Sequence, residues 1–163
     1  MTNSACVATS GTWFSPYDNK TWSAVLDVDI DHMVPLKNAW ASGANKWTTD
    51  ERGKFANDIT APQLWTVTDN LNQAKGDKSP DVWKPPLASF HCTYAKSWVE
   101  VKYKWKLSIT SAEKTALGSM IDTCQEGVKA GSGTSGADGS HGLLRGKALS
   151  AVLGLGVFLI FVG

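Results

Sequence analysis

The sequence has few cysteines and almost no net charge, and each shortage excludes a class of protein. Its three cysteines, Cys6, Cys92 and Cys124, include no Cys-x-x-Cys pair, which argues against a structural zinc site. Because three is an odd number, we expect the partner of Cys6 to lie in an N-terminal piece that precedes this chain. Lysine and arginine number 16 against 15 acidic residues, a net charge of +1. The overall charge therefore gives no global basic signal for nucleic acid, and any attraction to phosphate must be local.

The composition divides the chain into three zones. Residues 1–126 are rich in tryptophan, with enough large apolar side chains for a core, and are predicted to form one domain. Residues 127–147 are rich in glycine and serine, a composition that buries no core and predicts a flexible linker. Residues 148–163 form an apolar segment without a charged side chain.

The first half of the domain carries two periodic patterns. Residues 26–31 alternate apolar and acidic side chains, which predicts a strand with a buried apolar face and three carboxylates on the other face. Residues 40–55 are predicted to be loop-like with a helical fragment. Pro62 is tolerated at the start of a helix, and apolar residues follow at helical spacing at positions 64, 67, 71 and 74. We therefore predict one helix that begins at Pro62 and ends at Gly76.

Two further helices are predicted at the end of the domain. Apolar side chains recur at helical spacing at positions 94, 98, 101 and 105, and again at 117, 120, 121 and 124. The second helix begins with a capping box from Thr110 to Glu113. Cys92 starts the first helix and Cys124 ends the second, so an antiparallel pair of equal length brings both sulfurs to the same level. We predict a Cys92–Cys124 disulfide, with three free buried thiols as the alternative.

Residues suited to phosphodiester hydrolysis gather between positions 29 and 77. This reaction needs a base that activates water and a cation that neutralises the developing charge. Histidine titrates nearest neutral pH, so His32 is the candidate base. Asp31 and Asn72 carry the oxygen atoms that Mg²⁺ prefers, and Lys75 carries a charge suited to a phosphate oxygen. Each residue alone also has an ordinary explanation, such as a surface pair, a helix cap or a solvated helix end.

The order of the motifs resembles the HNH (ββα-metal, His-Me finger) endonuclease superfamily, and more narrowly the secreted HNH nucleases of fungi and actinobacteria. The matching motifs are Asp-x-Asp-His-x-Val-Pro-Leu, Ala-Trp-x-Ser-Gly-Ala, Phe-Ala-Asn-Asp, Asn-x-x-Lys-Gly-Asp and Trp-x-Pro. In this chain they occupy residues 29–36, 39–44, 55–58, 72–77 and 83–85. The resemblance spans roughly Cys6 to Cys124, and the motifs are specific when taken together.

The resemblance implies a role for each matching residue. His32 corresponds to the general base, and Asp31 and Asn72 correspond to the metal ligands. Asn57 corresponds to a further catalytic position, which we expect to support the loop that carries His32. The substrate-binding candidates are two lysines, Lys75 and Lys78.

Two features of the motifs leave alternatives open. Many HNH proteins have Asn-Leu where this chain has Gln63-Leu64, and Gln63 is still able to bond a backbone carbonyl. Asp31 and His32 point to opposite faces of a regular strand, so both serve one metal site only if the strand ends or bends there. The lysines at 102, 104 and 106 form either a nucleic-acid-facing edge or, more simply, a solvated helix face.

The resemblance implies an α+β fold, with a ββα-metal HNH core and additional helices that include the C-terminal helical hairpin. It implies an endonuclease that cuts DNA or RNA with little sequence specificity and uses a divalent metal, Mg²⁺ or alternatively Mn²⁺ or Zn²⁺. The expected location is extracellular or at the cell surface, and no protein partner is predicted. The alternative function is a catalytically inactive nucleic-acid-binding or cell-surface module on the same scaffold.

The C-terminal segment has the composition of a glycolipid-anchor signal. Such a signal has three small residues, a polar spacer and an apolar tail of about 10–20 residues. Ser135-Gly136-Ala137, residues 138–147 and residues 148–163 supply these parts in order. Ser135 is therefore the lipid-anchor candidate, and the alternative is an apolar tail that is retained in the membrane.

Overall fold

The computed structural model describes residues 11–129, with side chains as far as Cys124. The chain divides into two units, residues 1–132 and 133–163, and the described residues belong to the first. The expected apolar tail, the lipid-anchor candidate Ser135 and Cys6 lie outside the described residues. Within residues 11–129, no helix is both long enough and apolar enough to cross a membrane.

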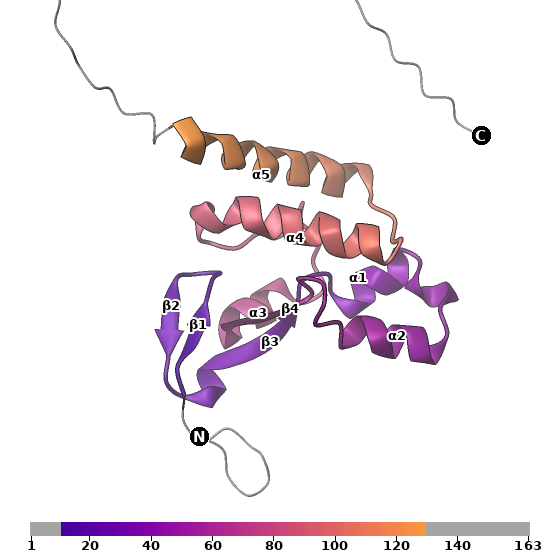
Figure 1. Cartoon of the computed structure of the whole chain (residues 1–163), viewed down its shortest axis with the longest axis horizontal. Coiled ribbons are helices and arrows are strands. Elements are labelled where there is room, and N and C mark those ends of the chain that lie inside the picture. Colours follow the sequence, from indigo (N-terminus) through magenta and orange to yellow (C-terminus); the bar gives the residue numbers. More distant parts are fainter. Residues whose placement is uncertain (1–10, 130–163) are drawn as a thin grey trace, which may run out of the picture. The chain divides into compact units, whose positions relative to one another are not determined.

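The described residues form two small antiparallel sheets and five α-helices, which agrees with an α+β fold (Figure 1). The strands are β1 Trp13–Ser15, β2 Lys20–Trp22, β3 Val28–His32 and β4 Leu64–Thr68. The α-helices are α1 Leu36–Ala41, α2 Thr49–Ala56, α3 Asp69–Lys75, α4 His91–Lys104 and α5 Ser111–Lys129. Short 3-10 helices occupy Val25–Asp27, Ala44–Lys46 and Ala88–Phe90.

β3 pairs with β4, with Val28 opposite Thr68 and His32 opposite Leu64. The single helix predicted from Pro62 to Gly76 is therefore wrong in its first half. Residues 64–68 read Leu-Trp-Thr-Val-Thr, a β-branched and aromatic run that favours a strand once a partner strand is available. The second half is α3, which ends at Gly76 as predicted, and α3 packs against both strands.

The faces of β3 are the reverse of those predicted. Ile30 is 58% exposed, whereas Asp31 is only 3% exposed. The alternation of apolar and acidic residues is present, but the carboxylate of Asp31 faces inward because it pairs with the buried ammonium of Lys75. A charge is tolerated in the interior when it is paired and hydrogen-bonded in this way.

The segment predicted to be loop-like contains two regular helices. α1 follows Pro35 directly, and α2 begins with a capping box that the prediction missed. The Thr48 amide donates to Glu51 Oε2 at 2.7 Å, and the Glu51 amide donates to Thr48 Oγ1 at 3.2 Å. This reciprocal pair satisfies two of the free amides at the helix start.

The predicted helical hairpin is confirmed. α4 and α5 run side by side and cover the remaining elements (Figure 1). Tyr94, Trp98 and Val101 of α4 are completely buried in the core. The predicted capping box is present, because the Glu113 amide donates to Thr110 Oγ1 at 3.1 Å while Glu113 accepts from the Thr110 amide at 2.8 Å.

The predicted disulfide is also confirmed. Cys92 and Cys124 are bonded, and their Cα atoms lie 5.1 Å apart. The bond joins the first turn of α4 to α5. It therefore closes the hairpin at the end opposite to the α4–α5 connection.

Candidate active site

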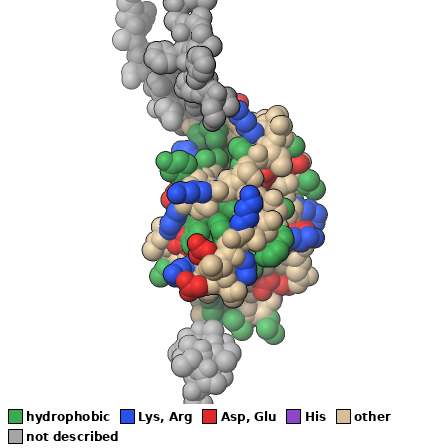
Figure 2. Space-filling view, turned by 90° about the vertical axis from the view of Figure 1, so that its right-hand side faces the viewer, with side chains coloured by type: hydrophobic (Ala, Val, Ile, Leu, Met, Phe, Trp, Pro, Cys, Tyr) green, Lys and Arg blue, Asp and Glu red, His purple; other side chains and the backbone are tan. Residues whose placement is uncertain are grey.

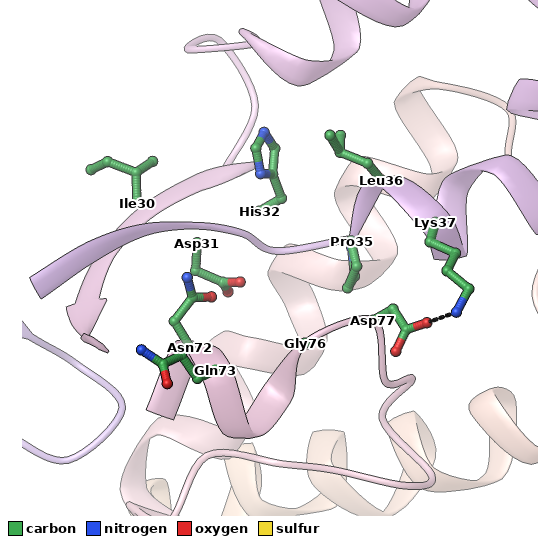
Figure 3. A pocket seen from close by; sticks show the side chains of 10 residues that line it. All are labelled: Ile30, Asp31, His32, Pro35, Leu36, Lys37, Asn72, Gln73, Gly76 and Asp77. Carbon is green, nitrogen blue, oxygen red and sulfur yellow. Dashed lines mark ion pairs between the residues drawn. The ribbon is translucent and has the colours of Figure 1, made fainter. Parts of the chain in front are cut away.

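A cleft of about 380 Å³ opens where β3 ends and α3 runs beneath it (Figure 3). Three of the predicted site residues, Asp31, His32 and Asn72, line it. Pro35 and Leu36, which begin the next segment, complete one side of the cleft. Residues that are 40 positions apart in the sequence are brought together because β3 pairs with β4 and α3 follows β4 at once.

His32 is held in one orientation by the end of α2. Its Nε2 atom lies 2.9 Å from the carbonyl oxygen of Ala56. Because a carbonyl only accepts hydrogen bonds, Nε2 carries the proton in this arrangement. The other ring nitrogen, Nδ1, is then the one with a lone pair to accept a proton, on a side chain that lines the cleft.

Gln63 ties down the segment that follows His32. Its side-chain oxygen accepts from the Val34 amide at 3.0 Å, and its side-chain nitrogen donates to the Val34 carbonyl at 3.0 Å. The Met33 amide donates to the Gln63 carbonyl at 2.7 Å. The backbone bond expected of Gln63 is thus present, and it is completely buried.

Asn57 lies at the end of α2, and its side chain is directed away from the His32 segment. Asn57 Nδ2 donates to the carbonyl of Gly53 at 2.9 Å, and the side chain is exposed. The contact between the Phe-Ala-Asn-Asp motif and His32 is made by the backbone of Ala56 instead.

Asp31 is the centre of a buried hydrogen-bond network. Lys75 Nζ donates to both carboxylate oxygens at 2.8 Å, and to the carbonyl of His32 at 2.7 Å. Tyr17 Oη donates to Asp31 Oδ2 at 2.5 Å. Lys75 is completely buried, so its ammonium serves Asp31 and the His32 backbone, and it does not face solvent.

The charges in this network perturb one another. Burial lowers the pKa of Lys75 from its usual value, against the attraction of Asp31, which raises it. Burial, together with the negative charge of Asp31, raises the pKa of Tyr17 well above its usual value. Tyr17 therefore remains a neutral hydrogen-bond donor to Asp31 at physiological pH.

Asn72 projects from α3 toward the strands. Its Nδ2 atom donates to Asp29 Oδ2 at 3.1 Å, which leaves the amide oxygen as the atom available for a ligand. Figure 3 shows Asp31 extending from β3 toward α3, while His32 points to the opposite side of the strand. The expected opposition of these two neighbours is therefore present even though β3 ends at His32.

Two side chains that line the cleft, Asp31 and Asn72, carry oxygen donors. They fit a hard divalent cation that takes one or two protein oxygens and completes its shell with water. No group of three or more His, Cys, Asp or Glu side chains suited to a metal occurs among the described residues.

The lysines near the cleft are divided between ion pairs and solvent. Lys37 pairs with Asp77 at the rim of the cleft (Figure 3). Lys78 is exposed and donates to the carbonyl of Ala74 at 2.6 Å. Figure 2 shows basic side chains interspersed with acidic and apolar ones on one face of the molecule.

Lys102 and Lys104 of α4, together with Lys106 just after it, form neither a continuous basic edge nor a fully solvated face. Lys102 is buried, and its Nζ lies 2.8 Å from Glu113 Oε1. Lys104 Nζ lies 2.8 Å from Asp58 Oδ2. Two of the three lysines are therefore used within the fold.

The sequence is similar to a family described as "GmrSD restriction endonucleases, C-terminal domain", whose model matches residues 5–120. The chain belongs to this family. A curated relative from Arthroderma benhamiae, named "Uncharacterized secreted protein", is 63% identical over 120 residues. That match covers 74% of this chain and 59% of the relative, so the chain spans about three fifths of the relative's length. No solved structure matches the chain.

Membership of the GmrSD C-terminal domain family suggests a nuclease-related function. The matched residues contain the whole cleft, from Tyr17 to Asp77. The contact of Tyr17 with Asp31 was not predicted from the sequence, because Tyr17 lies in a polar, turn-rich stretch with no motif. A buried tyrosine that binds a carboxylate leaves no periodic signal, and only the fold brings it to Asp31.

Proposed function

We propose that this chain is a metal-dependent HNH endonuclease that hydrolyses phosphodiester bonds in DNA or RNA with little sequence specificity. One observation carries the proposal: the His32 ring lines the cleft with Nε2 bonded to the Ala56 carbonyl. This bond fixes the tautomer in which Nδ1 is the acceptor. A fixed imidazole with a free acceptor is what a general base requires.

His32 Nδ1 takes a proton from the attacking water, and the Ala56 carbonyl stabilises the ring that becomes protonated. Asp31 and Asn72 would hold the divalent cation, and Asp29 orients the Asn72 amide. When bound, that cation supplies charge neutralisation at the phosphate. Lys75 holds the Asp31 carboxylate in place, and the exposed Lys78 is available for a neighbouring phosphate.

A second candidate function is a nucleic-acid-binding module without catalysis. The observation that favours it is the occupation of Asp31, because Lys75 donates to both of its oxygens. A carboxylate that is already neutralised binds a cation less strongly. Activity in the presence of Mg²⁺ distinguishes the two functions directly.

We also propose that the protein acts outside the cell. The relative from Arthroderma benhamiae is named a secreted protein. The Cys92–Cys124 disulfide supports this location, because disulfides persist in oxidising compartments and are rare in the cytosol.

The proposed function is tested by incubating the full chain with plasmid DNA and with RNA, with Mg²⁺ and with a chelator. We expect cleavage that the chelator abolishes, and a rate for His32→Ala that is lower by about 10²–10⁴-fold, the usual contribution of general acid–base catalysis. His91→Ala is the matched control, since His91 Nε2 also lies 2.8 Å from a backbone carbonyl, that of Pro85, but outside this cleft. Equal rates for the two variants would refute the role of His32.

A further inference from the structure

A second, largely apolar cavity of about 260 Å³ adjoins the active-site cleft. Leu36 lines both spaces. Ala56, whose carbonyl holds His32, also lines the second cavity. Figure 3 shows Leu36 on the same side of the ribbon as His32. The cavity therefore adjoins the cleft, and Leu36 and Ala56 link it to the surroundings of His32.

Trp40 provides an open aromatic surface at this cavity. It stands four residues after Leu36 on α1, so both side chains lie on one face of the helix. Trp40 is 51% exposed and Leu36 is 48% exposed. Exposed single apolar residues are ordinary, but these two line a cavity with Trp47 and Phe55.

Arg52 places a positive charge against Trp40. Its guanidinium carbon lies 5.4 Å from the centre of the Trp40 ring. The guanidinium is held by the carbonyl of Trp47 and by Thr49 Oγ1, the latter at 3.1 Å. The site thus combines an aromatic face, apolar walls and a fixed cation, which is the combination that receives bases of single-stranded nucleic acid.

We infer that this cavity receives one unpaired nucleobase of the substrate, next to the phosphate that is cleaved at His32. The inference rests on the proposed function and names its substrate class as single-stranded DNA or RNA. A base inside a duplex is stacked and paired, and it enters a pocket only after it is taken out of the stack. The enzyme consequently cleaves unpaired strands in preference to duplexes.

The test measures binding in a His32→Ala background, where no cleavage intervenes, with Mg²⁺ present. The probes are short labelled oligonucleotides of DNA and of RNA, each compared with the same backbone made of abasic sites. The His32→Ala protein is expected to bind the oligonucleotide with bases more tightly. Adding Trp40→Ala should raise the Kd for that probe by roughly 5- to 150-fold, the range for one stacked base, and leave the abasic probe unchanged. The polymer, DNA or RNA, whose base-containing probe binds more tightly than its abasic probe is the expected substrate.

Two further variants separate base stacking from folding. Trp40→Phe should restore most of the affinity, because it keeps an aromatic face. Tyr103→Ala, which removes an 84% exposed aromatic ring from α4, should leave the Kd unchanged. If Trp40→Ala does not fold, the inference is still tested by comparing the Kd of His32→Ala and of the Trp40→Phe variant for base-containing and abasic probes.

Cleavage assays distinguish failure of this inference from failure of the proposed function. If the wild type cuts nothing, the nuclease proposal fails. The inference that the cavity receives a base is then tested by the binding measurements alone. If the wild type cuts but Trp40→Ala keeps both the single-strand preference and the affinity, the cavity does not hold a base. Equal affinity of His32→Ala for base-containing and abasic probes overturns the inference as well.

Discussion

Asp31 has to serve two positive charges in the proposed mechanism. The buried ammonium of Lys75 already contacts both of its oxygens, and the cation would approach the same carboxylate from the side of Asn72. Removing Lys75 would leave a buried, unpaired carboxylate, and this is far more costly than losing a surface charge. The pair therefore holds the end of β3 in place.

The stability of this pair is tested by Lys75→Met. We expect the free energy of unfolding to fall by about 3–5 kcal/mol, because Asp31 is left without its buried partner. Lys78→Met, three residues later in the chain and exposed, is the control and should change stability by no more than about 0.5 kcal/mol. Chemical denaturation measures both. Equal stability of the two variants would show that Lys75 does not pair with Asp31 in solution.

The chemistry-bearing residues are easier to predict from sequence than their immediate partners. Asp31, His32 and Asn72 belong to motifs with fixed spacing, and they do share one cleft. The partners act through features that a motif does not contain. Ala56 contributes a backbone carbonyl. Lys75 lies on α3, 44 positions after Asp31, and its pairing with Asp31 reverses the expected exposure of the two faces of β3.

At the scale of elements, local signals are reliable and non-local pairing is not. The capping box before α5 and the apolar stripe of α4 depend on residues within one or two turns, and both predictions are confirmed. Leu64 and Val67 fit helical spacing equally well, yet they form β4 because β3 lies beside them. That pairing depends on residues 28–32, so it cannot be predicted from the local sequence around residues 64–68.

Asp58 joins the turn after α2 to the end of α4. It accepts from Lys104 Nζ at 2.8 Å, from Trp105 Nε1 at 2.8 Å and from the Thr60 amide at 2.9 Å. Burial raises its pKa, but these hydrogen bonds together outweigh burial and lower the pKa well below its ordinary value. Asp58 thus remains a carboxylate in the folded protein at pH values where it is protonated in the unfolded chain.

The lower pKa of Asp58 in the folded protein makes the stability of the fold depend on pH. Below about pH 4, the ordinary value for aspartate, the unfolded chain binds a proton that the folded protein does not, so stability falls as the pH falls. We expect Asp58→Asn to lower the free energy of unfolding at pH 7 by about 1–3 kcal/mol, the range for a hydrogen bond to a charged group. The difference in the free energy of unfolding between Asp58→Asn and the wild type should become smaller as the pH is lowered through 4.

Asp50→Asn provides the matched control for this pH dependence. Asp50 lies on α2, the helix that precedes Asp58, but its side chain is exposed and pairs with Lys54. Urea denaturation at a series of pH values compares the three proteins. A constant difference between Asp58→Asn and the wild type from pH 7 to pH 3 contradicts the argument.

At the scale of the whole molecule, the active-site elements and the covering hairpin depend on each other through the core. Tyr17 reaches Asp31 with its hydroxyl and packs its ring 6.0 Å from that of Tyr94 on α4. Both side chains are completely buried. Loosening α4 therefore weakens the support of Asp31, although no residue of α4 lines the cleft.

The last prediction concerns the bond that closes the hairpin. The Cys92–Cys124 disulfide spans 32 positions, and a loop of this size restricts the unfolded chain enough to stabilise the fold by about 2–4 kcal/mol. The Cys92→Ser/Cys124→Ser double variant should therefore unfold at a lower denaturant concentration by that free energy, as a reductant should make the wild type do. Adding the reductant to the double variant should change nothing further. Because Tyr94 lies on the hairpin helix that this bond secures, nuclease activity should be lost at the same lower denaturant concentration as the fold. Retention of the wild-type midpoint by the reduced protein would mean that the α4–α5 hairpin is held by packing alone.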